Sequence, residues 1–204
     1  MARAHIWSAL VLLGLAFGWN SPMPLVWAAL VAPCAGWYLG CQPQGRRRAF
    51  TIFQGALAVV CGLAMVGEAP AAGVLWAWCA LAGLSAVPYG LGERFGGPGS
   101  AHRGAVQFGI LGLLLAVLPT GAGLLDTGWA KRSPQLAGLA MDAAPTVFVL
   151  ECAGLDVFRM DMFYESETTD FVMGIRRPWD TPLAPLVVGS GLVALPRQQP
   201  SAST

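Results

Sequence analysis

Long apolar stretches, separated by short turns rich in Pro and Gly, fill the first 125 residues of the chain. A helix that crosses a bilayer takes roughly 17–25 mostly apolar residues, and these stretches are of that length. Hydrocarbon offers no hydrogen bonds, so a spanning segment must satisfy its own backbone, as a helix does. The five predicted helices occupy residues 4–19, 24–41, 49–67, 71–91 and 105–125. The pattern therefore predicts an all-α, polytopic transmembrane bundle over residues 1–125.

A polar segment follows at residues 126–181, where the charged residues are concentrated. Nine Asp, Glu, Lys and Arg residues lie from Arg3 to Asp126, but thirteen lie between Lys131 and Asp180. Within it, residues 136–155 are fairly apolar but contain two acids and a proline. One charge at the centre of a spanning helix costs about 2.5–3.5 kcal/mol on insertion scales. We therefore predict a re-entrant or interfacial helix here rather than a full crossing.

The last apolar run, residues 182–195, predicts a short final transmembrane helix. Its 14 residues would extend about 21 Å, less than a hydrocarbon core of roughly 30 Å. Such a helix spans with local thinning of the bilayer. We expect six crossings in all; a seventh, through residues 136–155, would move the C-terminus to the other side. The polar tail, residues 196–204, is expected to be disordered.

The arginines predict the orientation. Arg46, Arg47 and Arg48 follow the second helix, and Arg94 and Arg103 lie between the fourth and fifth, whereas residues 68–70 carry no basic side chain. Short cytoplasmic loops are enriched in Lys and Arg. The N-terminus is therefore expected in the cytoplasm, as an uncleaved first helix. Eleven of the twelve basic residues are Arg, and with abundant Ala and Gly this bias favours a bacterial inner membrane.

Composition excludes several classes of function. Apolar residues make up 55% of the chain and charged residues 11%, against about a quarter charged in soluble domains. The net charge of +1 gives no reason to expect a nucleic acid as partner. The chain leaves no room for a separate soluble domain, and the lipid bilayer is the expected surrounding.

Two GxxxG patterns fall inside predicted helices, at Gly14 and Gly18 and at Gly36 and Gly40. The absence of side chains lets two helix backbones approach closely in lipid. We expect the first two helices to contact each other, or a second subunit, at these glycines. With 26 glycines in the chain, such patterns also arise by chance.

The acidic series that begins at Asp142 is the candidate polar site. Asp142 and Glu151 lie in apolar surroundings, where carboxylates are expensive and often functional. Asp156 and Arg159 have the i, i+3 spacing of a helical ion pair. These residues could form a cation or proton site, or a catalytic acid/base pair. The alternative, which we favour, is an external loop whose acids are solvated.

Metal, cofactor and nucleophile motifs are weak or missing in the sequence. The two histidines, His5 and His102, fall at predicted cytoplasmic helix ends, so no haem or metal site is expected between them. The five cysteines form no CxxC pair. Four of them lie in predicted membrane helices and are expected to pack as small apolar residues, and Cys152 lies alone on the predicted external side, which argues against a structural disulfide there. We therefore predict no cofactor and no metal.

The predicted arrangement resembles that of the permeases of ATP-binding-cassette exporters. The similarity lies in six crossings, cytoplasmic termini and a re-entrant element before the last helix. It implies a separate ATPase chain as partner and transfers no site residue. We expect a non-catalytic membrane subunit of a larger complex, either of this permease-like kind in an exporter or purely structural. The alternative is an intramembrane or interfacial enzyme that uses Asp142 and Glu151.

Overall fold

The computed structural model describes residues 2–18, 21–43, 45–65, 71–123, 144–155 and 183–194, and every element in these ranges is a helix. The α-helices are α1 (Ala2–Leu13), α2 (Met23–Gly40), α3 (Arg46–Ala64), α4 (Ala71–Phe95), α5 (Ala101–Gly123), α8 (Pro145–Cys152) and α11 (Leu183–Ala194). Two short 3₁₀ helices, η1 (Gly14–Phe17) and η2 (Pro98–Ser100), precede α2 and α5. The predicted all-α class is confirmed.

Among the described residues, four helical stretches are long and apolar enough to cross a membrane: Met23–Gly40, Arg46–Ala64, Ala71–Phe95 and Pro98–Val117. They correspond to the second to fifth predicted spans. The first predicted span is shorter than expected, because the α-helix ends at Leu13 and continues as the 3₁₀ turn η1. The final apolar run forms α11, which has 12 residues.

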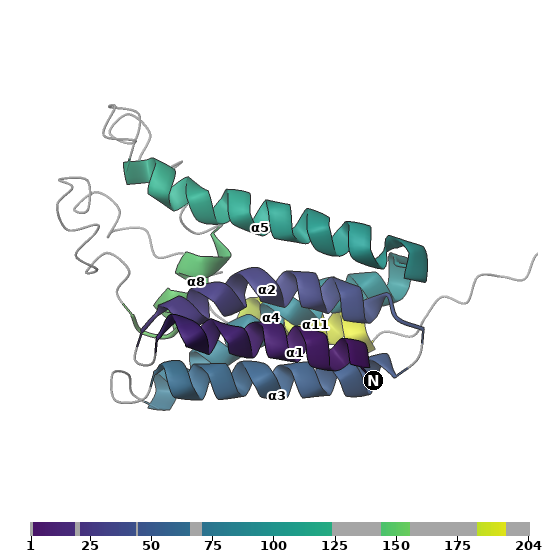
Figure 1. Ribbon diagram of the computed structural model, residues 1–204, viewed down its shortest axis with the longest axis horizontal. Helices are drawn as coiled ribbons and strands as arrows, with labels where there is room; N and C mark the ends of the chain where they lie inside the picture. The colour runs from purple at the N-terminus through teal and green to yellow at the C-terminus, as the bar shows by residue number, and fades with distance from the viewer. Residues whose placement is uncertain are drawn as a thin grey trace, which may run out of the picture.

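Helix α4 lies at the centre of the bundle, and its closest neighbour is α2 (Figure 1). A methyl group at Gly36 would overlap the Ser85 carbonyl oxygen, and one at Gly40 would overlap the Tyr89 carbonyl oxygen. The two helices therefore run in the same direction with their backbones in contact. Close approach of this kind is what small residues permit in a membrane. Gly36 and Gly40 thus face α4, whereas the sequence had suggested the first helix or a second subunit.

Helix α11 packs on another side of α4, also in the same direction. Gly83 lies against Pro185 and Leu186, and Gly189 lies against Ala86 and Val87. At the end of this contact, Arg94 donates hydrogen bonds from Nε and Nη2 to the Leu192 carbonyl oxygen, at 3.2 and 3.0 Å. Because the last carbonyls of a helix lack intrahelical partners, Arg94 satisfies one of those of α11.

Helix α1 is attached to α2 through an indole ring. Trp27 donates a hydrogen bond from Nε1 to the Leu10 carbonyl oxygen at 2.7 Å, and its ring lies directly against Gly14. Gly18, the second glycine of the predicted helical pattern, lies beyond the helix with a φ of 126°. Its position is a chain reversal that favours glycine, so Gly18 is not a packing position inside a helix as predicted.

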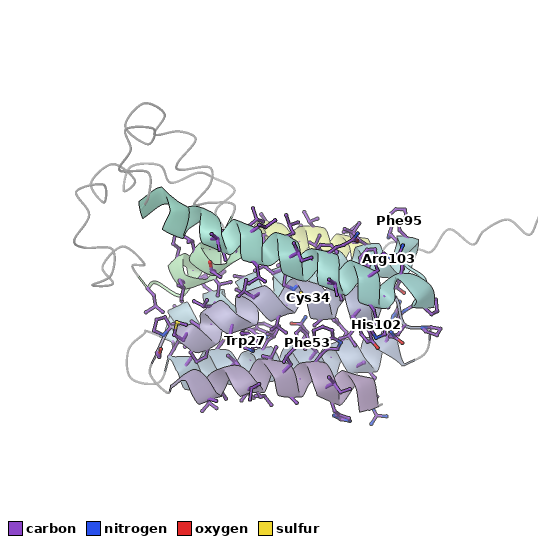
Figure 2. The ribbon with its side chains drawn as sticks, turned by 45° about the horizontal axis from the view of Figure 1, so that its top comes forward. Trp27, Cys34, Phe53, Phe95, His102 and Arg103 are labelled. Carbon is purple, nitrogen blue, oxygen red and sulfur yellow. The ribbon has the colours of Figure 1, made fainter. Side chains whose placement is uncertain are left out.

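Helix α5 lies along one side of the bundle and inclines away from it (Figure 1). Its start is held to the end of α2, where Trp37 donates a hydrogen bond from Nε1 to the Ser100 carbonyl oxygen at 3.4 Å. Phe95, His102 and Arg103 lie at this end of the bundle, and Trp27 lies toward the other (Figure 2). We call the end that carries Arg46, Arg94 and Arg103 the arginine end.

Helix α8 packs against α2, α4 and α5 at the end opposite the arginine end (Figure 1). It has eight residues, and Pro145, Thr146, Val147, Val149 and Leu150 are buried. Ala153, which follows it, lies against Gly73 near the start of α4. This helix is the described part of the predicted polar segment, residues 126–181. The rest of that segment and the predicted tail, residues 196–204, lie outside the described residues.

The contact between α2 and α4 predicts a large effect for a single added methyl group. Gly36→Ala should lower the free energy of unfolding by about 1–3 kcal/mol, because the new Cβ overlaps backbone that cannot move aside. Gly62→Ala is the matched control, since nothing lies within 4 Å of a Cβ there. That substitution should leave stability unchanged or raise it by up to about 1 kcal/mol through helix propensity. Unfolding in detergent micelles measures both, and equal stabilities would contradict the assigned contact.

Candidate functional site

Polar and aromatic side chains meet along the contact between α3 and α4, and we call this set the α3–α4 seam. It consists of Arg46, Phe50 and Gln54 from α3 and of Ser85, Tyr89 and Glu93 from α4. Within each helix the three residues are four apart, a spacing that places them on one face, one turn above the other. The residue numbers rise along α3 while those of their partners fall along α4, so the two helices are antiparallel. The contacts form three successive pairs, which we call rungs.

The outer rung is an ion pair between Arg46 and Glu93. Both side chains are largely covered, with 14% of Arg46 and 8% of Glu93 exposed. Arg46 is in the first turn of α3 and Glu93 in the last turn of α4. The helix dipole disfavours a cation at the N-terminus of a helix, where Arg46 lies, and an anion at the C-terminus, where Glu93 lies. Pairing the two charges therefore offsets an unfavourable interaction at both helix ends.

The middle rung is a stacked aromatic pair. The rings of Phe50 and Tyr89 have centroids 4.2 Å apart and planes inclined by 25°. Tyr89 is 1% exposed, and its ring fills the space between the two helices. Aromatic pairs of this geometry contribute about 0.5–1.5 kcal/mol beyond the area they bury.

The inner rung joins an amide and a hydroxyl. Gln54 donates a hydrogen bond from Nε2 to Ser85 Oγ at 2.8 Å, and Ser85 Oγ donates in turn to the Ala82 carbonyl oxygen at 3.0 Å. Trp78 donates from Nε1 to the Gln54 backbone oxygen at 3.3 Å. Ser85 is fully buried, and its hydroxyl is satisfied within the protein, as groups away from water must be.

The hydropathy pattern does not reveal this seam, because it places the charged residues in loops. The predicted connections included Arg46 to Arg48 and Glu93, but α3 begins at Arg46 and α4 continues to Phe95. The available signal was the i, i+4 spacing of polar and aromatic residues on both helices. Nothing in a single sequence shows that two such faces, about 40 residues apart, oppose each other.

The predicted acidic site is only partly covered by the structure. Glu151 is an exposed residue of the last turn of α8, at the end of the bundle away from the seam. Asp142, Asp156 and Arg159 lie outside the described residues, so their grouping stays a prediction. Within the described ranges, no three side chains of His, Cys, Asp or Glu are close enough to hold a metal ion.

The histidines both lie exposed on their helices. His102, on α5, makes an edge contact with the ring of Tyr38, with centroids 5.1 Å apart, and Tyr38 in turn contacts Trp7 of α1 at 5.6 Å. These contacts connect α1, α2 and α5 near the arginine end and bring no second ligand to His102 among the described residues.

Comparison of the chain with models of protein families, with curated proteins and with solved structures gave no match. The function is therefore inferred from the chain's own residues.

The ion pair leads to a prediction about single and double substitutions. Glu93→Gln leaves the largely buried Arg46 charge without its counter-ion and should cost about 3 kcal/mol of stability. The double variant Arg46→Leu/Glu93→Leu should recover most of this loss, because it removes both charges and both unfavourable dipole interactions.

Denaturant titration of the single and double variants in the same detergent measures the coupling. Arg48→Leu is the control, because Arg48 is exposed in the same turn and should change stability by less than about 0.5 kcal/mol. Additive losses in the double variant would show that the two charges are not coupled.

Proposed function

We propose that this protein is a non-catalytic, multi-pass membrane subunit of a larger complex. In one form of this proposal the complex is an exporter and the chain is its permease-like part. It lies in a bacterial inner membrane with the arginine end toward the cytoplasm. The observation that carries the proposal is an amide side chain on the exposed apolar face of α5.

Gln107 is exposed within the membrane-compatible stretch Pro98–Val117. Large apolar side chains surround it on the helix surface: Val106, Ile110, Leu111 and Leu114 are 51–61% exposed. The Gln107 side chain has no hydrogen-bond partner among the described residues. In hydrocarbon an amide without a partner is costly, and glutamines of this kind join helices through interhelical hydrogen bonds. A helix of another subunit beside α5 would supply the missing partner.

The directions of the helices support six crossings. Because α11 runs in the same direction as α4, it begins at the end where α5 finishes and ends at the arginine end. The end of α5 and the start of α11 thus lie at the same end of the bundle, as six crossings require. Helix α8, at about 12 Å long, is too short to cross and suits a re-entrant role. With α1 and α11 as short crossings, both termini lie in the cytoplasm.

The first test is whether Gln107 holds a partner. The tagged protein, extracted in mild detergent, should retain a stoichiometric partner subunit by mass spectrometry, and Gln107→Leu should lose it while remaining inserted in the membrane. Thr51→Val, an exposed polar residue of α3, is the control and should retain the partner. Co-purification of an ATPase would identify the exporter form. Recovery of the wild type alone, or of the same partner with Gln107→Leu, would overturn the proposal.

The orientation predicts which cysteine reacts from outside the cell. Cys152 is partly exposed at the end away from the arginines, whereas Cys34, Cys41, Cys61 and Cys79 are buried. A membrane-impermeant maleimide added to intact spheroplasts should therefore label the wild type but not Cys152→Ser. Labelling of Cys152 only after the membrane is broken would reverse the proposed orientation.

A further inference from the structure

Three arginine side chains at the arginine end are exposed, and we call this set the arginine rim. Arg47 and Arg48 lie in the first turn of α3, and Arg103 lies in the first turn of α5. None of the three forms an ion pair with another described residue. Their charges are therefore directed away from the bundle and toward its surroundings.

The other charged groups described in the bundle do not offset the rim. Arg46 pairs with Glu93, which is 8% exposed, so this carboxylate is used inside the α3–α4 seam. Arg94 is directed to α11, where it donates to the Leu192 carbonyl oxygen. Glu151, the other described carboxylate, lies at the opposite end of the bundle. The rim thus carries three positive charges that no described acid neutralises.

The rim lies at the depth of the phospholipid headgroups. Both helices that carry it begin a membrane-compatible stretch there, Arg46–Ala64 for α3 and Pro98–Val117 for α5. Within one to two turns of Arg103 the exposed side chains of α5 are apolar, as at Val106 and Ile110. A guanidinium at the boundary between such a stretch and water is level with the lipid phosphates, because long basic side chains reach from the end of a helix to the interface.

The rim is also divided between two sides of the bundle. Helix α2 contacts both α3 and α5, and these two helices lie on either side of it (Figure 1). A compact soluble protein bound on one side would leave the arginines of the other side without a counter-ion. Lipid surrounds the whole bundle and meets both sides at once, so the placement of the charges favours lipid over an acidic protein surface.

We propose that the arginine rim binds the phosphate groups of anionic phospholipids in the leaflet at the arginine end. A guanidinium offers parallel N–H donors that match the oxygens of a phosphate. A basic residue beside a membrane-spanning helix strengthens binding to an anionic membrane surface by about fivefold. Bound headgroups would supply the counter-ions that the described residues do not.

Native mass spectrometry of the full chain in detergent tests the proposal. The protein is mixed with equimolar palmitoyl-oleoyl phosphatidylglycerol, which is anionic, and palmitoyl-oleoyl phosphatidylcholine, which is zwitterionic. Both lipids contain a phosphate and the same acyl chains, so any preference reports the net charge of the headgroup. The wild type should prefer phosphatidylglycerol about tenfold, and Arg47→Gln/Arg48→Gln should lower this preference about fivefold or more.

Thr51→Val is the matched control, because Thr51 is exposed one turn after Arg47 and carries no charge; the preference should be unchanged. Equal binding of the two lipids by the wild type, or an unchanged preference in Arg47→Gln/Arg48→Gln, would overturn the proposal. Loss of a co-purifying protein from this variant with an unchanged lipid preference would also overturn it, and would assign the rim to an acidic protein surface.

Circular dichroism in the same detergent checks that the double variant keeps its helices. If it does not, Arg103→Gln on α5 replaces it, with an expected decrease of about threefold or more in the preference for phosphatidylglycerol. The rim depends on neither Gln107 nor a partner subunit, so this proposal can fail while the subunit proposal stands.

Discussion

The backbone contact between α2 and α4 is the interaction on which the rest of the bundle depends. In lipid, helices gain little from the hydrophobic effect when they associate, so association comes from close packing and polar contacts. Gly36 and Gly40 place α2 directly on the carbonyl oxygens of Ser85 and Tyr89. This contact fixes the rotation of α4, and the side chains of the same two residues are therefore directed to α3.

Helices α11 and α3 attach to α4 by two different means. Helix α11 uses small residues again, at Gly83 and Gly189, together with the hydrogen bonds from Arg94. Helix α3 instead uses paired side chains, and the bulk of Phe50 and Tyr89 keeps its backbone farther away. Side-chain contacts of this kind leave polar atoms between helices, and Gln54 Oε1 is one that has no hydrogen-bond partner among the described residues. Glycine packing leaves no such atoms.

Hydropathy alone predicted the class of the fold and the approximate place of the four long helices, because burial of the backbone in lipid demands continuous apolar runs. It could not assign Arg46 or Glu93 to helices, since each charge is tolerated there only through the other. The GxxxG pattern identified Gly36 and Gly40 as close-packing residues but suggested the wrong neighbour. Glycine spacing shows that a helix can be approached closely, and it does not show which other helix makes the contact. Of the predicted acidic site, only Glu151 is described. The α3–α4 seam escaped prediction because its rungs join residues that are 31 to 47 positions apart.

The seam also explains how α3 keeps its register. Apolar helices in lipid can slide past one another at small cost, because one aliphatic contact replaces another. The three rungs of the seam differ in chemistry: an ion pair, an aromatic stack and an amide–hydroxyl bond. A slip of one turn would place Glu93 beside Phe50 and Tyr89 beside Gln54, and would leave a charge unpaired in a region that penalises it. The polar residues of α3 and α4 are therefore costly to bury but make a single alignment strongly preferred, in the way that isolated polar residues set the register of coiled coils.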